Sequence, residues 1–471
     1  MRLADLAGID SDSQVTGFAI DHRKVAPGTI FGAFKGARFN GEDFIPDAVA
    51  SGAVAVVAAP EVRVEGTVHI AAEEPRRTFA QLAARFFKPF PATVVAVTGT
   101  NGKTSNVELT RQLWRMAGHH AASIGTLGVT TADDQASTGL TTPDIVTFLS
   151  NMGGLAREGV THAAFEASSH GLAQYRTEGL RVQAAAFTNF SRDHLDYHGT
   201  MDAYFEAKMR LFSEVVAPDG AAVIWMDDPR SEEVLRRCAA RGLRLLTVGP
   251  SGETLKLVDR SPSQLGQRLT ISLDGIARSV TIPLIGAYQA ANALTAAALV
   301  IATGGDPDRT LSDLARLQPV RGRLERAVIT RAGAPLYVDY AHTPDALQSA
   351  IEALKPHARG RLIIVFGAGG DRDTGKRPEM GEIAARMADL AIVTDDNPRS
   401  EDPAAIRRDV IAGAPQAREV PGRREAIAAA IAEATADDII LVAGKGHEQG
   451  QIIGDRILPF DDVSVARECA A

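Results

Sequence analysis

The chain has 471 residues, 45% of them hydrophobic and 23% charged, with a formal net charge of −8 at pH 7. This length exceeds one ordinary core, so we expect a soluble globular protein of two or three domains. An acidic chain without a prominent lysine and arginine block argues against nucleic acid or an anionic membrane as the main partner. The N-terminus lacks a signal-peptide core, no apolar run could span a bilayer, and the 2 cysteines are far apart. We therefore expect a cytoplasmic location.

Residues 1–88 are expected to form a small α/β unit. Thr29–Phe34 and Ala53–Ala58 have the apolar, β-branched composition of strands, and a short helix is predicted between them over Ile45–Ser51. The polar segment Asp21–Gly28 is predicted to be a turn before the first strand.

A second unit is predicted to follow the linker Lys88–Pro91, whose two prolines end the preceding helix. From Ala92 to Pro319 strands alternate with helices, the pattern of a parallel sheet with helices on both faces. The expected strands are Thr93–Thr98, His162–Glu166, Ala184–Asn189 and Ala221–Met226.

The segment Thr98-Gly-Thr-Asn-Gly-Lys-Thr104 connects the first of these strands to a helix predicted over Ser105–Ala117. A glycine turn at a helix N-terminus directs backbone N–H groups at one point, which suits phosphate. Lys103 can then reach the β- and γ-phosphates, and the Thr104 hydroxyl can hold Mg²⁺. The two glycines enclose two residues, whereas the general P-loop has four. The order of strand, turn, Lys-Thr and helix favours a nucleotide over a plain glycine turn.

Acidic and imidazole side chains follow two later strands of this unit. Glu166 leaves a buried strand, where a carboxylate can bind Mg²⁺ or simply cap a helix. Asp193, His194 and Asp196 crowd into four positions of the loop Thr188–Gly199, although a lone histidine is more often structural.

Two further residues cannot be assigned from their local sequence. Lys208 lies on a predicted helix, where a surface position is its ordinary interpretation. Asn292 lies near the start of an Ala/Leu-rich helix that runs to about Ala302, as either a helix cap or a nucleotide contact.

The last unit, about residues 320–471, repeats the α/β pattern. Its expected strands are Leu336–Tyr340, Arg361–Phe366, Ala391–Thr394 and Ile439–Val442, with helices over Pro344–Leu354 and Arg424–Glu433. Each strand runs into a charged loop. Carboxyl ends of parallel strands meet at one edge of a sheet, so the four loops predict one binding face. The loops are Asp339–Asp345, Gly367–Asp373, Asp395–Arg399 and Gly444–Glu448.

These motifs, taken in order along nearly the whole chain, resemble those of the Mur ligase family of ATP-dependent amide-forming enzymes. The resemblance rests on the Asp21-His-Arg turn, Gly99-Thr-Asn-Gly-Lys-Thr104, Thr141-Thr-Pro143, Glu166-Ala-Ser-Ser-His-Gly171, Asp193-His-Leu-Asp196, Asp339-Tyr-Ala-His-Thr-Pro344, Gly370-Asp-Arg-Asp373, Asp396-Asn-Pro-Arg399 and Gly444-Lys-Gly-His-Glu448.

The resemblance implies three domains. Residues 1–88 would bind the UDP end of a substrate, residues 89–319 would bind ATP on a P-loop-type parallel sheet, and residues 320–471 would form a Rossmann-like domain for the incoming amino acid. It implies an enzyme of peptidoglycan precursor synthesis that acts as a monomer, without nucleic acid or membrane partners. ATP would phosphorylate the D-glutamate carboxylate of UDP-N-acetylmuramoyl-L-alanyl-D-glutamate, and meso-2,6-diaminopimelate would displace phosphate from the acyl phosphate.

The family pattern also assigns residues to these steps. ATP would be bound by Gly99, Thr100, Asn101, Gly102, Lys103, Thr104, Ser105, Asn292, Arg323, Asp339 and His342. Mg²⁺ would be bound by Thr104, Glu166, His194 and Lys208, the last as a carbamate. Carbamylation converts the lysine cation to a carboxylate-like anion, so Lys208 joins Lys103, Glu166 and His194 as catalytic residues.

Substrate contacts carry over in the same way. The UDP-linked substrate would meet His22, Thr141, Thr142, Ser168, Gln174 and Arg176. Diaminopimelate would meet Arg372, Asp396, Asn397, Pro398, Arg399, Gly444 and Glu448. Arg399, helped by Arg372, can pair with the distal carboxylate that lysine lacks, and Glu448 can bind the distal ammonium.

Three positions depart from the family pattern, and several alternatives stay open. His22 stands where serine is usual, Gln289 replaces an asparagine and Ala368 replaces a cysteine. A lysine-adding ligase or a folylpolyglutamate synthetase is the nearest alternative enzyme. A catalytically silent nucleotide-binding protein is the alternative from another class, and a scaffold protein is the least favoured.

Overall fold

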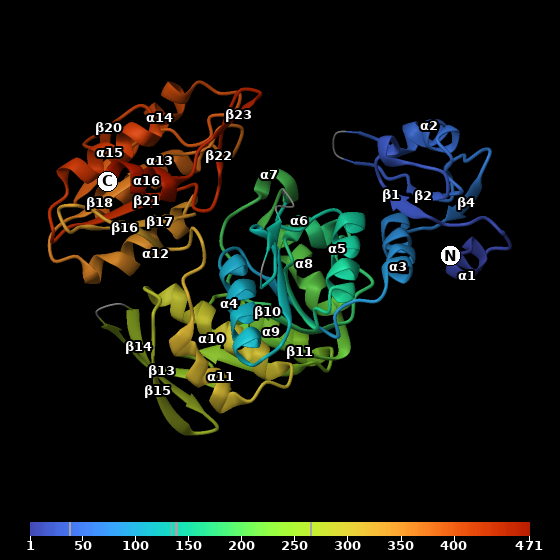
Figure 1. The fold of residues 1–471 in the computed structure, drawn as a ribbon, viewed down its shortest axis with the longest axis horizontal. Coiled ribbons are helices and arrows are strands. Elements are labelled where there is room, and N and C mark those ends of the chain that lie inside the picture. Colours follow the sequence, from blue (N-terminus) through green and yellow to red (C-terminus); the bar gives the residue numbers. More distant parts are fainter. Residues whose placement is uncertain (37–38, 133, 137–139, 264–265) are drawn as a thin grey trace.

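The computed structural model describes residues 1–36, 39–132, 134–136, 140–263 and 266–471. Its strands form a four-stranded, an eleven-stranded and a six-stranded sheet in chain order, with a separate hairpin. In Figure 1 the N-terminal unit (blue) and the C-terminal unit (orange and red) stand at opposite ends of the central unit. The predicted three-part α/β architecture is confirmed.

The N-terminal unit is a parallel sheet with the order β1-β2-β3-β4. Its strands are β1 (Gly17–Ala19), β2 (Thr29–Gly32), β3 (Ala55–Ala58) and β4 (Val68–Ala71). Its helices are α1 (Leu3–Ala7), α2 (Ile45–Ala50) and α3 (Pro75–Phe87), with 3₁₀ turns at His22–Lys24 and Gly41–Phe44. The polar turn predicted before β2 is therefore a short 3₁₀ helix, capped by the Asp21 carboxylate.

The central sheet has the order β15-β14-β13-β12-β11-β10-β5-β9-β6-β7-β8. Its strands are β5 (Thr93–Thr98), β6 (Ala121–Gly125), β7 (Gly128–Thr130), β8 (Gln135–Ala136), β9 (His162–Glu166), β10 (Val182–Phe187), β11 (Val216–Trp225), β12 (Arg244–Gly249), β13 (Leu255–Ser263), β14 (Gly266–Leu273) and β15 (Ile276–Ile282). Its helices are α4 (Lys103–Met116), α5 (Ile145–Arg157), α6 (Ser169–Ala173), α7 (Leu195–His198), α8 (Met201–Arg210), a π-helical turn at Leu211–Val215, α9 (Ser231–Ala240), α10 (Ala287–Ala302), α11 (Pro307–Asp313) and a 3₁₀ turn at Leu314–Arg316.

The central sheet is parallel at the predicted strands, and antiparallel strands that were not predicted extend both of its edges. Strands β6 and β9 through β13 pair in parallel around β5, but β13, β14 and β15 form an antiparallel meander, and β7 and β8 extend the other edge antiparallel. Asp274 and Gly275, both at positive φ, join β14 to β15 as a two-residue hairpin turn. An Asp-Gly pair between alternating apolar residues is the sequence signal for this hairpin.

The C-terminal sheet has the order β16-β17-β21-β18-β19-β20 and is parallel except for β16. Its strands are β16 (Glu325–Ile329), β17 (Pro335–Asp339), β18 (Leu362–Phe366), β19 (Leu390–Val393), β20 (Arg418–Glu419) and β21 (Ile439–Ala443), and the hairpin is β22 (Gly450–Ile453) with β23 (Arg456–Pro459). The helices are α12 (Pro344–Leu354), a 3₁₀ turn at Lys355–His357, α13 (Lys376–Met387), α14 (Pro403–Ala412), α15 (Arg423–Glu433) and α16 (Asp462–Ala470).

Hydrophobic cores lie on both faces of the two larger sheets. One apolar cluster runs from the N-terminal unit through α3 and α5 into one face of the central sheet. The opposite face is covered by α4 and α10, and the interior of α10 is almost wholly buried, as its Ala/Leu-rich composition predicts. These layers fix the strand ends that carry the polar loops.

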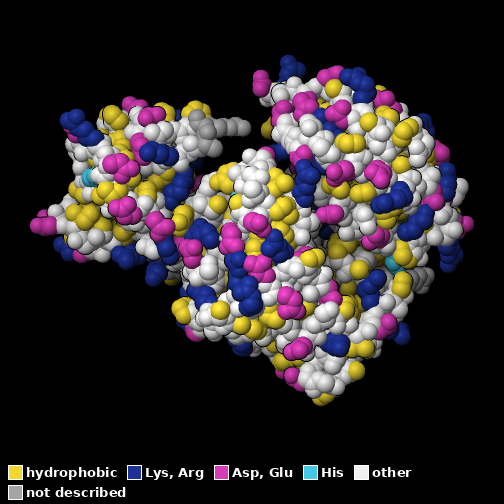
Figure 2. Space-filling model, turned by 180° about the vertical axis from the view of Figure 1, so that it is seen from behind, with side chains coloured by type: hydrophobic (Ala, Val, Ile, Leu, Met, Phe, Trp, Pro, Cys, Tyr) yellow, Lys and Arg dark blue, Asp and Glu magenta, His cyan; other side chains and the backbone are white. Residues whose placement is uncertain are grey.

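The surface carries charges of both signs. On the face seen in Figure 2, Lys and Arg side chains alternate with Asp and Glu, and open space separates the N-terminal and C-terminal units. Within the described residues, every helix is too short or too polar to cross a lipid bilayer.

Candidate functional site

The glycine loop after β5 has the conformation that the sequence predicts. Gly99 has φ +146° and a Cβ there would overlap Thr188 Oγ1, while Gly102 has φ +86° and a Cβ would lie 2.5 Å from Asn292 Oδ1. Both positions therefore require glycine. Helix α4 starts at Lys103, two residues earlier than predicted. Asn189, which follows β10, is hydrogen-bonded to the loop. Its backbone carbonyl accepts from Thr100 N, and its side-chain Oδ1 accepts from Asn101 N.

Two lysines converge on this loop. Lys103 Nζ donates to the carbonyl oxygens of Gly99 and Thr100 at 3.0 and 2.8 Å. Lys208, only 1% exposed, donates from Nζ to Gly99 O at 2.7 Å and lies 4.2 Å from the centroid of the Tyr204 ring. Burial lowers the pKa of both ammonium groups, that of Lys208 well below its ordinary value. Lys208 is thus a buried residue of the site, and the surface interpretation is wrong.

Glu166 ends β9, lines the same cavity as Lys103 and Lys208, and is 1% exposed. Thr126 donates to its carboxylate from N at 2.7 Å and from Oγ1 at 3.2 Å. Burial raises the pKa of Glu166, which Lys103 and these donors oppose. A helix-capping role is excluded because α6 is capped by Ser168 instead.

The donors near Glu166 are compatible with Mg²⁺. Thr104 and Glu166 line one cavity and offer hydroxyl and carboxylate oxygens, the hard ligands that Mg²⁺ prefers. The described residues contain no group of three His, Cys, Asp or Glu side chains that could hold an ion by themselves. A Mg²⁺ ion here would need further oxygens, as from nucleotide phosphates. Thr104 Oγ1 accepts a hydrogen bond from Arg323 at 3.1 Å.

His194 follows in the loop after β10, in the left-handed region at φ 55°. Its Nε2 lies 3.4 Å from Asp193 Oδ2, and its ring meets that of His170 edge-on at 4.8 Å. Burial lowers the pKa of His194 to about 4, against the opposing effect of Asp193. The imidazole is therefore neutral at neutral pH, the form that can ligate a metal.

A cavity of about 440 Å³ lies between the central and C-terminal units. Of the predicted residues, it is lined by Thr100, Asn101, Gly102, Lys103, Thr104, Ser105, Thr141, Glu166, Ser168, His194, Lys208, Asn292, Arg323, Asp339 and His342. Asn292 lies inside α10 and accepts from Asn106 Nδ2 at 2.9 Å, whereas Gly286 is the residue at the helix start. The helix-cap alternative for Asn292 is therefore wrong, and its side chain faces the glycine loop.

The C-terminal side of this cavity is built on the end of β17. Asp339 accepts hydrogen bonds from Leu324 N and Ala341 N at 2.7 and 2.8 Å, and from the Tyr288 hydroxyl at 3.3 Å. Burial raises the pKa of Asp339. This carboxylate thereby connects Leu324, which directly precedes β16, and Tyr288 of α10 to the end of β17.

The residues predicted for the UDP-linked substrate form one connected group, apart from His22. Thr142 Oγ1 lies 2.9 Å from Ser168 Oγ, and Arg176 donates to Thr142 O at 2.9 Å and to Gln174 Oε1 at 2.7 Å. Thr141 joins them through Thr126 at 3.0 Å. His22 lies in the N-terminal unit, where its ring stacks on Phe44 with centroids 4.3 Å apart.

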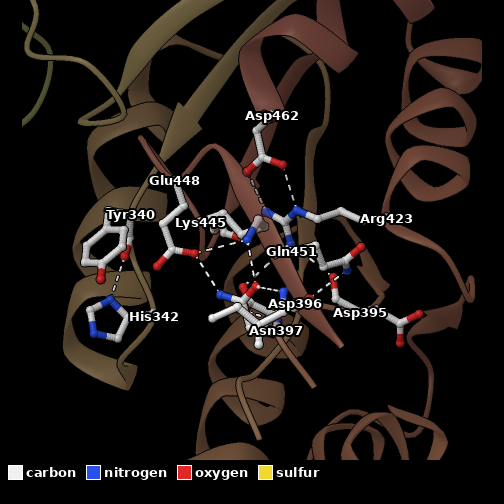
Figure 3. Close-up of polar contacts among 12 residues, drawn as sticks. Tyr340, His342, Asp395, Asp396, Asn397, Arg423, Lys445, Glu448, Gln451 and Asp462 are labelled. Atoms are coloured by element: carbon white, nitrogen blue, oxygen red, sulfur yellow. Dashed lines mark hydrogen bonds and ion pairs between the residues drawn. The ribbon is translucent and has the colours of Figure 1, made fainter. Parts of the chain in front are cut away.

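The residues predicted for diaminopimelate lie in the loops that follow β18, β19 and β21. Figure 3 shows three of them, Asp396, Asn397 and Glu448, around Lys445. Glu448 Oε2 accepts from Asn397 Nδ2 at 2.8 Å and from Lys445 Nζ at 3.0 Å. Lys445 is 0% exposed and also donates to Asn397 Oδ1 at 3.0 Å. Asp396 Oδ2 is buried and has no hydrogen-bond partner among the described residues.

The two arginines of this pocket meet over Gly369. A Cβ at Gly369 would lie 2.9 Å from Arg399 Nη1 and 3.9 Å from Arg372 Cγ, so the missing side chain leaves room for both. Arg399 Nη1 donates to Gly370 O at 2.7 Å. Its remaining guanidinium donors can pair with an added carboxylate.

Some site residues were not predicted. Thr126 donates to Glu166, and Lys445 donates to Glu448. The Tyr340 ring lies beneath the Arg323 guanidinium and meets the His342 ring edge-on. Thr126 follows β6, which the periodicity did not indicate. Lys445 lies within a quoted motif, but burial alone distinguishes it from a surface lysine.

Three family models match the chain in succession. These are the Mur ligase family, catalytic domain over residues 14–109, the Mur ligase middle domain over residues 97–300, and the Mur ligase, glutamate ligase domain over residues 322–446. The chain belongs to the Mur ligase family. Its resemblance to these Mur ligases extends over the glycine loop, the interface cavity and the C-terminal loops.

Individual Mur ligases match over nearly their whole length. The UDP-N-acetylmuramoyl-L-alanyl-D-glutamate–2,6-diaminopimelate ligase of Zymomonas mobilis subsp. mobilis is 61% identical, over 98% of this chain and 95% of the relative. The ligase of the same name from Bradyrhizobium diazoefficiens is 50% identical, over 98% and 97%. A solved structure of a ligase with this name is 33% identical, with a TM-score of 0.73 over 100% of this chain and 98% of that one. MurF ligase from Thermotoga maritima in complex with ADP, at 21% identity and a TM-score of 0.64 over 97% of each chain, shares the fold.

Proposed function

We propose that this Mur ligase uses ATP to join meso-2,6-diaminopimelate to the D-glutamate side-chain carboxylate of UDP-N-acetylmuramoyl-L-alanyl-D-glutamate, a step of peptidoglycan precursor synthesis. The observation that carries the proposal is the Arg399 and Glu448 pocket, an arginine fork and a carboxylate beside the nucleotide cavity. The names and near-complete coverage of the 61% and 50% identical relatives support it.

The proposed reaction has two steps. A carboxylate oxygen of D-glutamate attacks the γ-phosphorus of ATP, the bond to the ADP oxygen breaks, and an acyl phosphate forms. The neutral amine of diaminopimelate then attacks the acyl carbon, its extra proton passes to the departing phosphate, and the tetrahedral intermediate breaks its bond to that phosphate to leave the amide. Lys103 would turn from the loop carbonyls to the transferring phosphoryl group and offset its charge, and the loop N–H groups would hold its position.

We assign Mg²⁺ to Thr104, Glu166, His194 and a carbamylated Lys208. Bound Mg²⁺ supplies Lewis-acid charge stabilisation to the phosphoryl oxygens. The low pKa of Lys208 supports the carbamate, because carbon dioxide adds to a neutral amine. Glu166 supplies its buried carboxylate, and Asn292, Arg323, Asp339 and His342 would hold ATP from across the cavity.

Recognition of the two other substrates follows from charge. Thr141, Thr142, Ser168, Gln174 and Arg176 would hold the muramoyl dipeptide with its carboxylate near Glu166, and His22 would contribute from the uridine side. Arg399 and Arg372 would pair with the distal carboxylate of diaminopimelate, and Glu448 with its ammonium. Lysine would leave Arg399 without that carboxylate, so the pocket disfavours it.

We also propose residues 1–88, 89–319 and 320–471 as the domains for the UDP-linked substrate, ATP and the amino acid. The end of α3 at Phe87 before β5, and the start of a separate sheet at Glu325, support these boundaries. The enzyme would act in the cytoplasm, because ATP and the UDP-linked precursor are cytoplasmic metabolites. We propose that it acts as a monomer on these small molecules.

The experiment that tests the function is phosphate release from ATP with the UDP-linked dipeptide, comparing meso-diaminopimelate with L-lysine. We expect turnover with diaminopimelate alone. Turnover with lysine instead would support a ligase reaction but contradict the assignment of the Arg399 and Glu448 pocket to diaminopimelate. Release with neither amino acid would favour the silent nucleotide-binding protein.

A further inference from the structure

The segment that carries Arg399 is bonded residue by residue to the loop that carries Arg372. Gly370 N donates to Asn397 O at 2.9 Å, and Arg399 Nη1 returns a bond to Gly370 O at 2.7 Å. One residue further, Ser400 Oγ donates to Asp371 Oδ1 at 2.6 Å. The separation of the two arginines is therefore set by contacts between their neighbouring residues, together with the bond from Arg399 itself to Gly370.

Glu401 completes this connection. Its Oε1 accepts from Asp371 N at 2.6 Å, and its two carboxylate oxygens accept from Arg377 Nη2 at 2.8 and 2.9 Å. The Arg377 side chain is 2% exposed and also bonds Asp409 through Nη1 at 2.9 Å. Glu401 thus connects a buried cation in α13 to the backbone of Asp371, the residue next to Arg372.

The backbone here needs such support. Asp371 and Arg399 are both at φ 52°, a region that non-glycine residues seldom adopt without surrounding constraints. Arg399 N donates to Ile452 O at 3.0 Å, and Gly454 N donates to Arg399 O at 2.7 Å, so the β22–β23 hairpin holds Arg399. Asp371 instead bonds the residues beside Arg399: its backbone N–H donates to Glu401, and its carboxylate accepts from Ser400.

We infer that Glu401 and Arg377 are positioning residues for amino-acid selection: they hold the Arg372 loop against the Arg399 turn at the spacing that a distal carboxylate requires. The inference rests on the proposed function, because it needs diaminopimelate to be the amino acid that these arginines bind. Neither residue is among those that we assign to the substrate. A recognition site acts well only when the groups behind it fix its geometry.

The test compares Glu401→Ala with Asp409→Ala in the full-length enzyme. Each substitution removes one carboxylate from Arg377, but only Glu401 also binds Asp371 N. We expect Glu401→Ala to raise KM for diaminopimelate by roughly tenfold or more and to reduce its preference over lysine, with KM for ATP unchanged. Asp409→Ala should leave KM for diaminopimelate, KM for ATP and the preference for diaminopimelate over lysine within about twofold of wild type.

Further measurements separate positioning from folding. Glu401→Gln retains one oxygen acceptor for Asp371 N and should restore part of the affinity for diaminopimelate. Thermal unfolding of each variant shows whether the fold persists. Unchanged KM for diaminopimelate in Glu401→Ala, or equal increases for ATP and diaminopimelate, would overturn the inference while leaving the proposed function intact. A wild-type enzyme that does not turn over diaminopimelate would overturn both.

Discussion

Lys208 donates a hydrogen bond of 2.7 Å from Nζ to the carbonyl oxygen of Gly99, the first glycine of the nucleotide loop. The bond joins α8 to the turn after β5 across more than a hundred residues of sequence. Because Lys208 is 1% exposed and Lys103 is close, its charged form is disfavoured. A buried amine whose charged form is disfavoured suits the carbamate that we propose at this position.

Replacing Lys208 with Ala should abolish turnover. The variant loses the anion that we assign to Mg²⁺ and the acyl phosphate, and electrostatic groups of this kind contribute roughly a hundredfold or more to rate. Phosphate release with all substrates measures the effect, and far-UV circular dichroism checks the fold. Wild-type enzyme freed of carbon dioxide should lose activity and regain it with bicarbonate. Near-normal activity in Lys208→Ala would remove the carbamate from the mechanism.

Replacing Arg399 with Ala should lower kcat/KM for diaminopimelate by roughly 30-fold or more, because losing one partner of a buried charge pair costs about 2–5 kcal/mol. The activity with lysine should change less, so discrimination should fall. Arg399→Lys should recover little, since an ammonium lacks the planar fork. Arg408→Ala, which removes an exposed arginine from the same unit, is the matched control. An equal loss with both amino acids would contradict the specificity role.

The Asp462→Ala substitution should destabilise the C-terminal unit by about 3–5 kcal/mol, because it leaves a buried guanidinium unpaired. Arg423 and Asp462 are both 0% exposed and share two hydrogen bonds of 2.7 Å. Glu468→Ala removes the exposed partner of Arg424 on the same two helices and should change stability little, because solvent screens an exposed ion pair. Urea unfolding monitored by circular dichroism compares the two. Similar losses would show that burial does not determine the outcome.

Stability should fall as the pH drops below about 6.5, the ordinary pKa of histidine. Burial lowers the pKa of His194 and His198 to about 4, so between these values the unfolded chain binds more protons than the folded one. The stabilisation is complete above the unfolded pKa and is lost as the pH falls through the folded pKa. Melting temperatures from about pH 7.5 to about pH 4.5 should therefore decline.

His198→Gln provides the control for this pH dependence. Burial also lowers the pKa of His162 to about 4 and that of His447 to about 3, so the variant removes one of four strongly shifted histidines. Its melting temperature should therefore fall less steeply with pH than that of the wild type. Identical slopes for the two proteins would assign the pH dependence to other groups.

Local sequence was sufficient to predict features formed by a single strand and the few residues that follow it. The glycine loop was predictable because Gly99 and Gly102 need backbone conformations that glycine adopts freely, and an apolar strand and a helix flank them. The four C-terminal loops were predictable as one face because parallel strands end at the same edge. Helices α10 and α12 have the bounds expected from their composition and from the capping Thr343 with Pro344.

Other features depend on contacts between distant segments. Local sequence leaves Lys208 a surface residue and Asn292 a possible cap, and only the family resemblance assigned them to the site. The structure buries Lys208 against Gly99 and turns Asn292 toward Asn106. The hairpin signal at Asp274-Gly275 was not used in the prediction, and only the pairing of β13, β14 and β15 shows that these strands extend the central sheet.

The sequence by itself determined the elements, the nucleotide loop and the set of charged loops, because these follow from backbone preference, hydrophobic periodicity and motif order. Only the tertiary structure decided which charges lose water and which partners replace it. Lys208, Glu166 and Lys445 are ordinary charged residues until the sheets bury them, and burial is what shifts the pKa of the first two and what fixes Lys445 on Glu448. Desolvation is a property of the assembled units, and no single segment of sequence carries it.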